Sequence, residues 1–526
     1  MAESTTPTIR LNEREKRLKD LLVDVAHFID TNPVDTAEDG KTKPEPVVLR
    51  WAGGWVRDKL LGIESHDIDT AINCMTGEAF ALRLRTFCES EANREKHSIG
   101  PEDVSILYKV ARNPEKSKHL ETTTSRLFGL DIDFVNLRRE TYAEDSRNPQ
   151  MEFGTPEEDA ERRDATVNAL FYRLDTESIE DFTGGLPDLE AKLMRTPLEP
   201  LKTFTDDPLR VLRLIRFASR LGFTIDPAAA KVMADETVLR NLKVKISRER
   251  VGVELEKMLK GNHPRVALKL IDSLGLYHTI FTDPGRQMPT PDTTNWGVVY
   301  TCLDSLAADN TPDSIFARLV ANDEEKYVAW VFATVVPWEQ QLPDPRPKGK
   351  KSAPPLSSLV AREGFKAPNK VSDIITAAHS HRPKMVELKD AVCTAEARMS
   401  QRDYFGLAIV GWDSGVGHWR LQLLYAILAD IELRAGKGTD VKDVLAEWQK
   451  LLDHLVRLDL MNVPQLKRLV DGNMLGRELG LKPGIWVKRA KEIALEWQLR
   501  NPEATDPAGA LEEVTKRRGE LPIQGG

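Results

Sequence analysis

Two aspartates one residue apart, Asp67 and Asp69, are the clearest candidates for chemistry in this sequence. They lie in DIDTAI, where the alternation of polar and apolar residues predicts a β-strand. Because side chains i and i+2 of a strand point to one face, both carboxylates project together. A divalent cation with oxygen ligands, above all Mg²⁺, would relieve their repulsion. The pair therefore predicts a metal site, and two surface aspartates are the alternative for an isolated D-x-D.

A glycine pair precedes these acids in AGGWVRDKLLG. Gly53 and Gly54 follow a short apolar strand and lead into a helical pattern that contains Arg57. Without side chains, the glycines let a phosphate chain approach the backbone closely. No G-K-[ST] follows, so the segment is not a P-loop. At this spacing from the D-x-D, a phosphate site is favoured over a simple turn.

A second D-x-D, Asp131 and Asp133, lies in the predicted strand LDIDFVNLR. The same alternation places both carboxylates on one face. Asp133 is the better candidate for a third catalytic, metal-facing carboxylate. Solvent-facing acids at a sheet edge remain an equal alternative.

Consecutive charges end a helical pattern in EEDAERRDATVNALFY. The guanidiniums of Arg162 and Arg163 could hold phosphate or sugar oxygens, and Asp164 could accept a hydrogen bond from a ribose hydroxyl. A solvated helix end is the alternative.

The segment TDDPLRVLRLIRFASRLGF predicts a helix that starts at Asp207 as N-cap with Pro208 in the first turn. Asp207 and Arg210, one turn apart, offer an acceptor and donors suited to the edge of a nucleobase. Four arginines share one face with no acid between them, which places that face near phosphates or near acids of the preceding region: Arg210, Arg213, Arg216 and Arg220.

A later helix start is predicted in KISRERVGVELEKMLKG, with Ser247 as N-cap and a pair between Arg250 and Glu254. Lysines and arginines around it form a basic cluster, for which a solvated face is the alternative.

Strand patterns concentrate between residues 47 and 185, and helical periodicity dominates after about residue 200. Residues 12–30 predict an amphipathic helix, and the Pro-, Lys- and Ser-rich segment 342–358 predicts a surface loop or linker. The fold class is therefore α+β, with a mixed β-sheet and flanking helices followed by an all-α region.

Charge and cysteine content exclude several classes of protein. The 82 acids against 74 lysines and arginines argue against non-specific coating of nucleic acid, although a local basic groove remains compatible with them. The four cysteines form no C-x-x-C pair, which excludes a disulfide scaffold and a thiolate zinc site. The longest apolar stretch, residues 327–338, is too short to span a membrane, so we expect a soluble intracellular protein.

Five motifs in order resemble the class II CCA-adding tRNA nucleotidyltransferases of the eukaryotic, fungal type, within the polymerase β-like superfamily. They lie between Val48 and Leu276 and read GGWVRD…DID, RRDATVNALFY, DFTGGLPDL, DDPLRVLRLIRF and SRERVGVEL. The resemblance implies two-metal nucleotidyl transfer with Mg²⁺, in which CTP and ATP extend the 3′ end of tRNA by CCA and release pyrophosphate. It also implies action in nucleus and cytoplasm, with a mitochondrial form, and no membrane partner.

The resemblance assigns roles to individual residues. Asp67 and Asp69 would bind the metals, and the nucleotide-binding residues would be Gly53, Gly54 and Arg57 at the triphosphate, Arg163 and Asp164 at the ribose, Asp207 and Arg210 at the base, and Arg213. Residues that couple or stabilise head and neck would be Gly184, Asp188, Ser247, Glu249 and Arg250. Glu140, Asp145 and Arg147 would belong to a flexible loop over residues 140–150 that helps switch from C to A.

The implied organisation has five parts: an N-terminal helix and linker (1–46), a catalytic head (47–195), a base-reading neck (196–275), a body (276–400) and a tRNA-binding tail (401–526). One departure is visible, because the family's E-D-x-x-R reads D-D-P-L-R over residues 206–210. The alternatives are a poly(A) polymerase, an enzyme that adds only CC or only A, a non-catalytic RNA-binding protein, and a metal-dependent phosphohydrolase.

Overall fold

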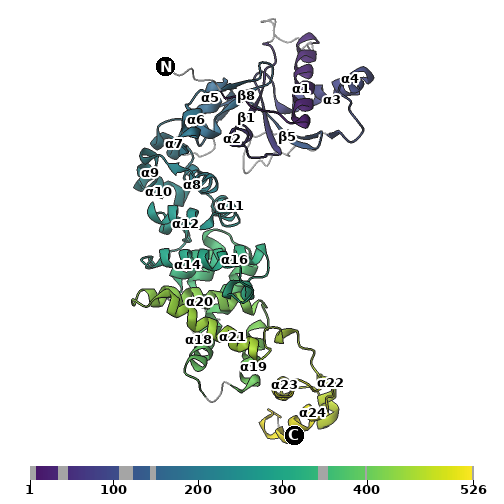
Figure 1. The fold of residues 1–526 in the computed structure, drawn as a ribbon, viewed down its shortest axis with the longest axis vertical. Coiled ribbons are helices and arrows are strands. Elements are labelled where there is room, and N and C mark those ends of the chain that lie inside the picture. The colour runs from purple at the N-terminus through teal and green to yellow at the C-terminus, as the bar shows by residue number, and fades with distance from the viewer. Residues whose placement is uncertain are drawn as a thin grey trace. The chain divides into compact units, whose positions relative to one another are not determined.

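The computed structural model describes residues 7–32, 45–105, 123–141, 150–341, 353–396 and 400–523. The chain divides into two compact units, an N-terminal unit, Met1–Ile246, and a C-terminal unit, Ser247–Gly526 (Figure 1). The mixed sheet lies in the first unit and the second is helical, which confirms the predicted fold class. The finer boundaries inside these units stay predictions.

Strands of the N-terminal unit form one large sheet and two small ones. They are β1 (Leu49–Ala52), β2 (Asp67–Ile72), β3 (Val104–Ser105), β4 (Thr123–Leu127), β5 (Leu130–Asn136), β6 (Arg138–Thr141), β7 (Gln150–Phe153), β8 (Phe171–Arg173), β9 (Ser178–Glu180), β10 (Leu193–Met194) and β11 (Thr224–Ile225). Within the described residues, the large sheet has seven strands in the order β3-β4-β5-β2-β1-β8-β9. Its central pair, β2 and β5, runs parallel, and the neighbouring pairs are antiparallel.

Helices of the same unit pack on this sheet and continue beyond it. They are α1 (Glu13–Thr31), α2 (Gly54–Leu60), α3 (Gly77–Glu89), α4 (Glu91–Lys96), α5 (Pro156–Glu161), the 3₁₀ helix η1 (Thr166–Asn168), α6 (Gly185–Glu190), α7 (Pro200–Asp206), α8 (Arg210–Leu221), α9 (Pro227–Met233) and α10 (Glu236–Lys245). Helix α1 confirms the amphipathic helix predicted over residues 12–30, and a capping box of Asn12 and Glu15 begins it.

The two faces of the sheet differ in what they bury. Ile68 and Ile72 of β2 point into the main core, which α1 and α3 close with Leu18, Leu22 and Phe80. Ala71 points to the opposite face, where a smaller apolar cluster includes residues of α5 and β8. Because side chains alternate along β2, Asp67 and Asp69 share this second face.

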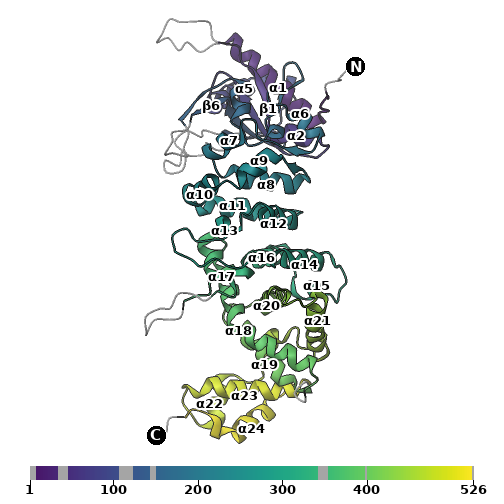
Figure 2. The same cartoon turned by 90° about the vertical axis from the view of Figure 1, so that its left-hand side faces the viewer.

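The C-terminal unit is built from helices (Figure 2). They are α11 (Arg248–Leu259), α12 (Pro264–Ser273), α13 (Tyr277–Ile280), α14 (Trp296–Ala308), α15 (Ile315–Leu319), α16 (Asp323–Val335), η2 (Val336–Trp338), α17 (Leu356–Leu359), the π-helical turn η3 (Val360–Gly364), α18 (Asn369–Cys393), α19 (Arg402–Asp413), α20 (Trp419–Ala435), α21 (Val441–Arg457), η5 (Val463–Gln465), α22 (Gly472–Leu479), α23 (Trp486–Arg500), α24 (Ala508–Lys516) and η6 (Arg518–Glu520).

The prediction of a surface loop or linker over residues 342–358 is wrong for its last residues, 356–358. Residues 342–352 lie outside the described residues, but α17 begins at Leu356, and Ser357 and Ser358 are buried. The Ser358 hydroxyl donates to the carbonyl oxygen of Ser372 on α18 at 2.8 Å. Composition alone missed this because a serine can be buried where a neighbouring helix accepts its hydrogen bond, as α18 does for Ser358. In the described residues no helix combines the length and hydropathy needed to cross a membrane.

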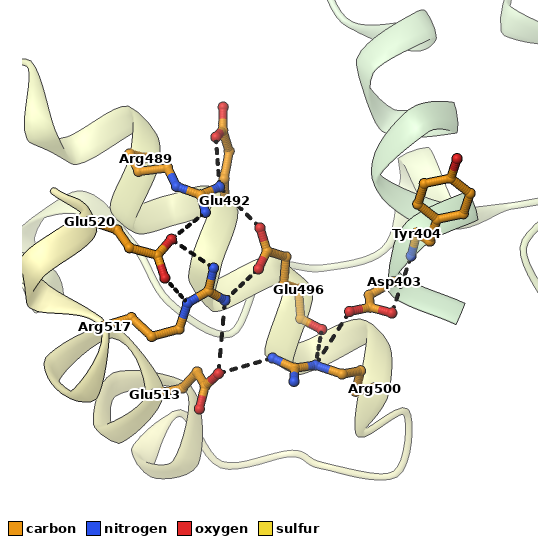
Figure 3. A network of polar contacts seen from close by, with 9 residues as sticks. All are labelled: Asp403, Tyr404, Arg489, Glu492, Glu496, Arg500, Glu513, Arg517 and Glu520. Carbon is orange, nitrogen blue, oxygen red and sulfur yellow. Dashed lines mark hydrogen bonds and ion pairs between the residues drawn. The ribbon is translucent and has the colours of Figure 1, made fainter. Parts of the chain in front are cut away.

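Ion pairs join the last helices of the chain (Figure 3). Arg517 contacts Glu496 of α23 and Glu520 of η6, and Arg489 of α23 also contacts Glu520 at 2.6 Å. Arg500 contacts Glu513 of α24 and extends the network to α19 through Asp403 at 3.4 Å. These contacts fasten α23 to the segment after it.

A carboxyl group lies in the core of the C-terminal unit with one oxygen unsatisfied. Glu432 on α20 is 9% exposed, and its Oε2 atom has no hydrogen-bond partner among the described residues. Burial raises the pKa of Glu432 to about 8, and the nearby acids Asp292 and Glu339 add to the shift while Arg382 opposes it. The folded protein therefore keeps this group protonated at neutral pH.

Replacing Glu432 with Gln should stabilise the C-terminal unit at high pH. Because the folded-state pKa lies above the ordinary 4.5, folding takes up a proton between these values, so stability is full below pH 4.5 and falls as the pH rises toward about 8. Glutamine is neutral in both states, so Glu432→Gln should exceed the wild type by about 4 kcal/mol at pH 8 and by almost nothing at pH 4.5. Urea denaturation followed at several pH values measures this gap. Parallel curves for the two proteins would show that Glu432 is ionised in the fold.

Candidate active site

Four carboxylates stand on one face of the central parallel strands. The register of β2 and β5 places Asp67 beside Asp131 and Asp69 beside Asp133. The sequence predicted each pair separately, and the pairing of the strands brings them together. The Asp133 carboxylate accepts a hydrogen bond of 2.6 Å from the Thr124 hydroxyl of β4.

Asp67 and Asp69 are exposed to solvent. Among the described residues, no group donates a hydrogen bond to either carboxylate or forms an ion pair with it. The protein around them nevertheless removes part of their hydration. This burial raises the pKa of both groups, and Asp133 raises it further, while Arg163 lowers that of Asp69. Two unsatisfied carboxylates that repel each other fit a divalent cation with oxygen ligands. In the described part of the chain no three acidic, His or Cys side chains are grouped to hold a metal alone.

The loop between β1 and α2 approaches the rest of the site with its backbone. Gly53 has a φ of +69°, in the left-handed region, and its N–H donates to the Leu170 carbonyl oxygen at 2.9 Å. A Cβ atom built on Gly53 would lie 2.5 Å from Nη1 of Arg163. The Arg163 guanidinium therefore lies against this glycine, and a larger residue would displace it.

Arg163 is held in place by a buried acid that sequence reasoning missed. Its Nε and Nη2 atoms donate to Oδ2 of Asp159 at 3.1 and 3.0 Å, and Nη1 donates to the Asn168 carbonyl oxygen. Asp159 is 1% exposed and also accepts from Arg162. Burial would raise the pKa of Asp159, but Arg162 and Arg163 outweigh it and lower the pKa. The spacing of three and four residues along α5 was the signal for these pairs.

Glu140, the first residue of the predicted flexible loop, is part of a strand in the structure. It lies in strand β6, and its side chain is 7% exposed, because Arg138 and Arg162 contact the carboxylate at 3.2 and 3.1 Å. Arg210 of α8 lies 3.8 Å from the same group. The first residue of the expected loop is therefore fixed in an arginine cluster. Asp145 and Arg147 lie outside the described residues.

Asp164 is enclosed between α8 and η1. Its carboxylate accepts from Nε of Arg213 at 2.6 Å and from the Asn168 amide at 2.9 Å. Burial alone would raise its pKa, but Arg213, the Asn168 amide and Arg210 together lower the pKa to about 2. The acid is therefore ionised and rigidly placed at physiological pH.

The predicted base-reading pair lies at the junction of α7 and α8. Helix α8 begins at Arg210, whereas Asp207 is the C-cap of α7 and its carboxylate accepts a hydrogen bond from the Leu209 N–H at 3.1 Å. Asp207 is half-buried, and Arg210 is 6% exposed with Nη2 donating to the Arg162 carbonyl oxygen at 2.6 Å. The predicted capping contact of Asp207 and the proline after it are therefore present, in a turn that precedes the first residue of α8.

The arginine face of α8 meets acids of the sheet region, as one of the two sequence interpretations proposed. Arg213 pairs with Asp164 and Arg220 with Asp58 of α2. Arg57 is 2% exposed, pairs with Asp58 and lies 5.3 Å above the Phe217 ring. Its predicted contact with a triphosphate stays a prediction.

The predicted coupling residues Gly184 and Asp188 lie at the start of α6 and within it. Gly184 is in the left-handed region, and the buried Asp188 carboxylate accepts from the Thr166 hydroxyl at 2.7 Å. Arg195 contacts the same carboxylate at 3.3 Å, which ties α6 to η1 and to the segment after β10.

The remaining predicted residues, Ser247, Glu249 and Arg250, begin the C-terminal unit. Ser247 is the N-cap of α11 and accepts from the Arg250 N–H, which confirms the predicted helix start. Sequence reasoning missed Arg248, which is buried and donates to the carbonyl oxygens of Gly364 and Ile280.

Two family models match the chain. The one described as the poly(A) polymerase head domain covers residues 49–195, and the probable RNA and SrmB-binding site of polymerase A covers residues 222–287. Nucleotidyltransferase lcsQ of Purpureocillium lilacinum is 52% identical to this chain over 98% of it and 93% of the relative. The mitochondrial CCA tRNA nucleotidyltransferase of Saccharomyces cerevisiae is 36% identical to this chain over 95% of it and 92% of the relative.

Solved structures share the fold at low sequence identity. The Thermotoga maritima CCA-adding enzyme complexed with tRNA has a TM-score of 0.60 at 19% identity, with 97% of both chains covered. The Bacillus stearothermophilus CCA-adding enzyme in complex with CTP has a TM-score of 0.56 at 19% identity, with 97% of this chain and 100% of that chain covered. The arrangement of sheet and helices is therefore that of class II CCA-adding enzymes.

Proposed function

Because the chain belongs to the CCA-adding and poly(A) polymerase family of nucleotidyltransferases, we propose that it adds CCA to the 3′ end of tRNA from CTP and ATP. The observation that carries the proposal is the pair of unsatisfied carboxylates, Asp67 and Asp69, on the sheet face where Arg163 lies against Gly53. An acid pair supplies metal ligands, and an arginine beside a glycine turn suits a nucleoside triphosphate.

In the proposed reaction the 3′ hydroxyl of the RNA attacks the α-phosphorus of the nucleotide, and pyrophosphate leaves. Mg²⁺ held by Asp67 and Asp69 would lower the pKa of the hydroxyl and neutralise charge on the phosphate. Arg163 adds a fixed positive charge beside the Gly53 backbone, where the triphosphate can approach. Asp164 is ionised and can accept a hydrogen bond from a ribose hydroxyl, which a deoxyribose lacks at the 2′ position.

Asp207 and Arg210 would read the base. Cytosine and adenine both present an amino group next to a ring nitrogen acceptor, whereas uracil and guanine present a carbonyl oxygen at the amino position. The Asp207 carboxylate can accept from the amino group, and the guanidinium of Arg210, which has five N–H donors, can donate to the ring nitrogen. One pair of side chains would thus accept CTP and ATP and reject UTP and GTP.

One observation favours a second candidate, transfer of a nucleotide to another acceptor. The relative at 52% identity is named a nucleotidyltransferase without an acceptor, and the identity to a CCA tRNA nucleotidyltransferase is 36%. The two candidates share the site but differ in the molecule that carries the attacking hydroxyl. Since relatives with the CCA activity are named as mitochondrial, we also propose that a form of this protein acts there as well as in nucleus and cytoplasm.

The test is single-nucleotide addition to two RNAs, a tRNA that ends before CCA and one that ends in CC. With Mg²⁺ present, we expect CTP alone to extend the first RNA by two residues and ATP alone to extend the second by one. Long A tracts from ATP would favour a poly(A) polymerase. No extension of either RNA, from enzyme that still binds CTP, would favour another acceptor.

A further inference from the structure

Helix α8 is held by buried acids at two points of one face. Arg213 and Arg220 are seven residues apart, which is two helical turns or about 10 Å along the axis. Arg213 contacts Asp164 at 2.6 Å, and Arg220 contacts Asp58 at 3.3 Å. Asp58 belongs to α2 in the sheet region, so the second contact joins parts of the chain that are 162 residues apart.

The two points are connected by a continuous run of polar contacts. From Asp164 the run passes to the Asn168 amide at 2.9 Å, and the other end of that amide accepts from Arg57. Arg57 Nε then donates to Oδ1 of Asp58 at 2.7 Å, while Oδ2 of Asp58 accepts from Arg220. We call these six residues the α8 clamp: Arg213, Asp164, Asn168, Arg57, Asp58 and Arg220.

Asp58 connects two helices, because its Oδ1 accepts from Arg57 of α2 and its Oδ2 accepts from Arg220 of α8. It is 4% exposed and Arg57 is 2% exposed, so water screens their contact little. Arg220 is half exposed, with a side-chain exposure of 52%, so its contact with Asp58 is weaker than a buried ion pair. Losing it should therefore leave the helix folded.

We propose that Asp58 is a positioning residue for nucleotide selection, because it holds the end of α8 that lies away from Arg210. Arg210 and Arg213 hold the first half of α8, through the Arg162 carbonyl oxygen and through Asp164, and Arg220 holds its last turn through Asp58. A shift of the last turn would tilt the helix and move Arg210 at its start together with the turn that contains Asp207. The contact at Arg220 opposes this shift. The inference rests on the proposed base-reading role of Asp207 and Arg210.

The test is the selectivity of Asp58→Asn, Arg220→Gln and the double variant, measured as the ratio of kcat/KM for CTP to that for UTP on a tRNA lacking CCA. A displacement of the order of 1 Å can change rates by up to about 100-fold, so we expect a roughly tenfold lower ratio in each single variant. The ratio in the double variant should be no lower than in the less selective of the two single variants, because both single substitutions remove the same contact between Asp58 and Arg220. A smaller folded fraction lowers kcat for every nucleotide alike and leaves the ratio unchanged.

Lys59→Gln is the matched control, since Lys59 follows Asp58 on α2 but pairs with Glu15 of α1 at 2.7 Å. Its selectivity should equal that of the wild type. An unchanged ratio in Arg220→Gln, whose exposed side chain leaves the fold intact, would overturn the inference, as would losses that multiply in the double variant. A wild-type enzyme that adds no C to this RNA would instead refute the proposed function.

Discussion

Asp67→Asn and Asp69→Asn should each lower nucleotide incorporation by about 1,000-fold or more, because a neutral amide cannot replace a charged metal ligand. The fold should tolerate both changes, since the carboxylates are solvent-accessible and make no hydrogen bond among the described residues. Burial raises the pKa of Asp69 and the Asp67 charge raises it further, so Asp67→Asn also removes part of that shift. Initial rates of labelled CTP incorporation, together with thermal unfolding, measure the two effects.

Asp131→Asn is the matched control for this prediction. Asp131 is the strand neighbour of Asp67 on the same face, but its side chain is 61% exposed and lies 3.8 Å from Arg126. We expect its activity to stay within about threefold of the wild type, as for other exposed ion pairs. Equal losses in Asp131→Asn and Asp67→Asn would mean that overall charge on this face, and not metal ligation by Asp67 and Asp69, supports the reaction.

Asp207→Ala should blur nucleotide choice more than it slows the chemistry. The variant loses the acceptor for the amino group that distinguishes cytosine from uracil, and a site that hydrogen-bonds its substrate rejects analogues mainly through such groups. We expect the preference for CTP over UTP to fall by about 100-fold, with kcat for CTP lowered by less than about tenfold. Sequencing of products formed with all four nucleotides reports this directly.

Asp206→Ala tests whether the effect belongs to that one carboxylate. Asp206 is the adjacent acid, at the end of α7, and burial raises its pKa although Arg210 and Lys202 oppose this. Its removal should leave the product sequence unchanged. A clean CCA product from Asp207→Ala would refute the base-reading role, whatever the behaviour of Asp206→Ala.

Local periodicity was sufficient to predict much of the fold. The alternation in DIDTAI and LDIDFVNLR predicted two strands with acids on one face, and the structure has both strands. The apolar spacing of residues 12–30 predicted α1 in the same way. These predictions succeeded because hydrophobic period is a property of neighbouring residues.

Contacts between distant residues could not be predicted from local patterns. Arg213 contacts Asp164, which is 49 residues away in the sequence, and Arg220 contacts Asp58, which is 162 residues away. The roles of Glu140 and Asp159 depend equally on the packing of β6, α5 and α8. The first α-helical residue of α8 is Arg210, three residues after the predicted start, because Asp207 and Pro208 form a turn that leads into the helix. The local capping propensity of Asp207 was nevertheless predicted correctly, since its carboxylate accepts from the Leu209 N–H.

We propose that protein side chains alone direct the addition of a defined triplet. The most direct measurement is the length and sequence of the product when a tRNA that ends before CCA is incubated with Mg²⁺, CTP and ATP together. We expect an extension of three residues that reads CCA and then stops. An open-ended A tract, or an extension whose sequence follows the relative concentrations of CTP and ATP, would contradict it.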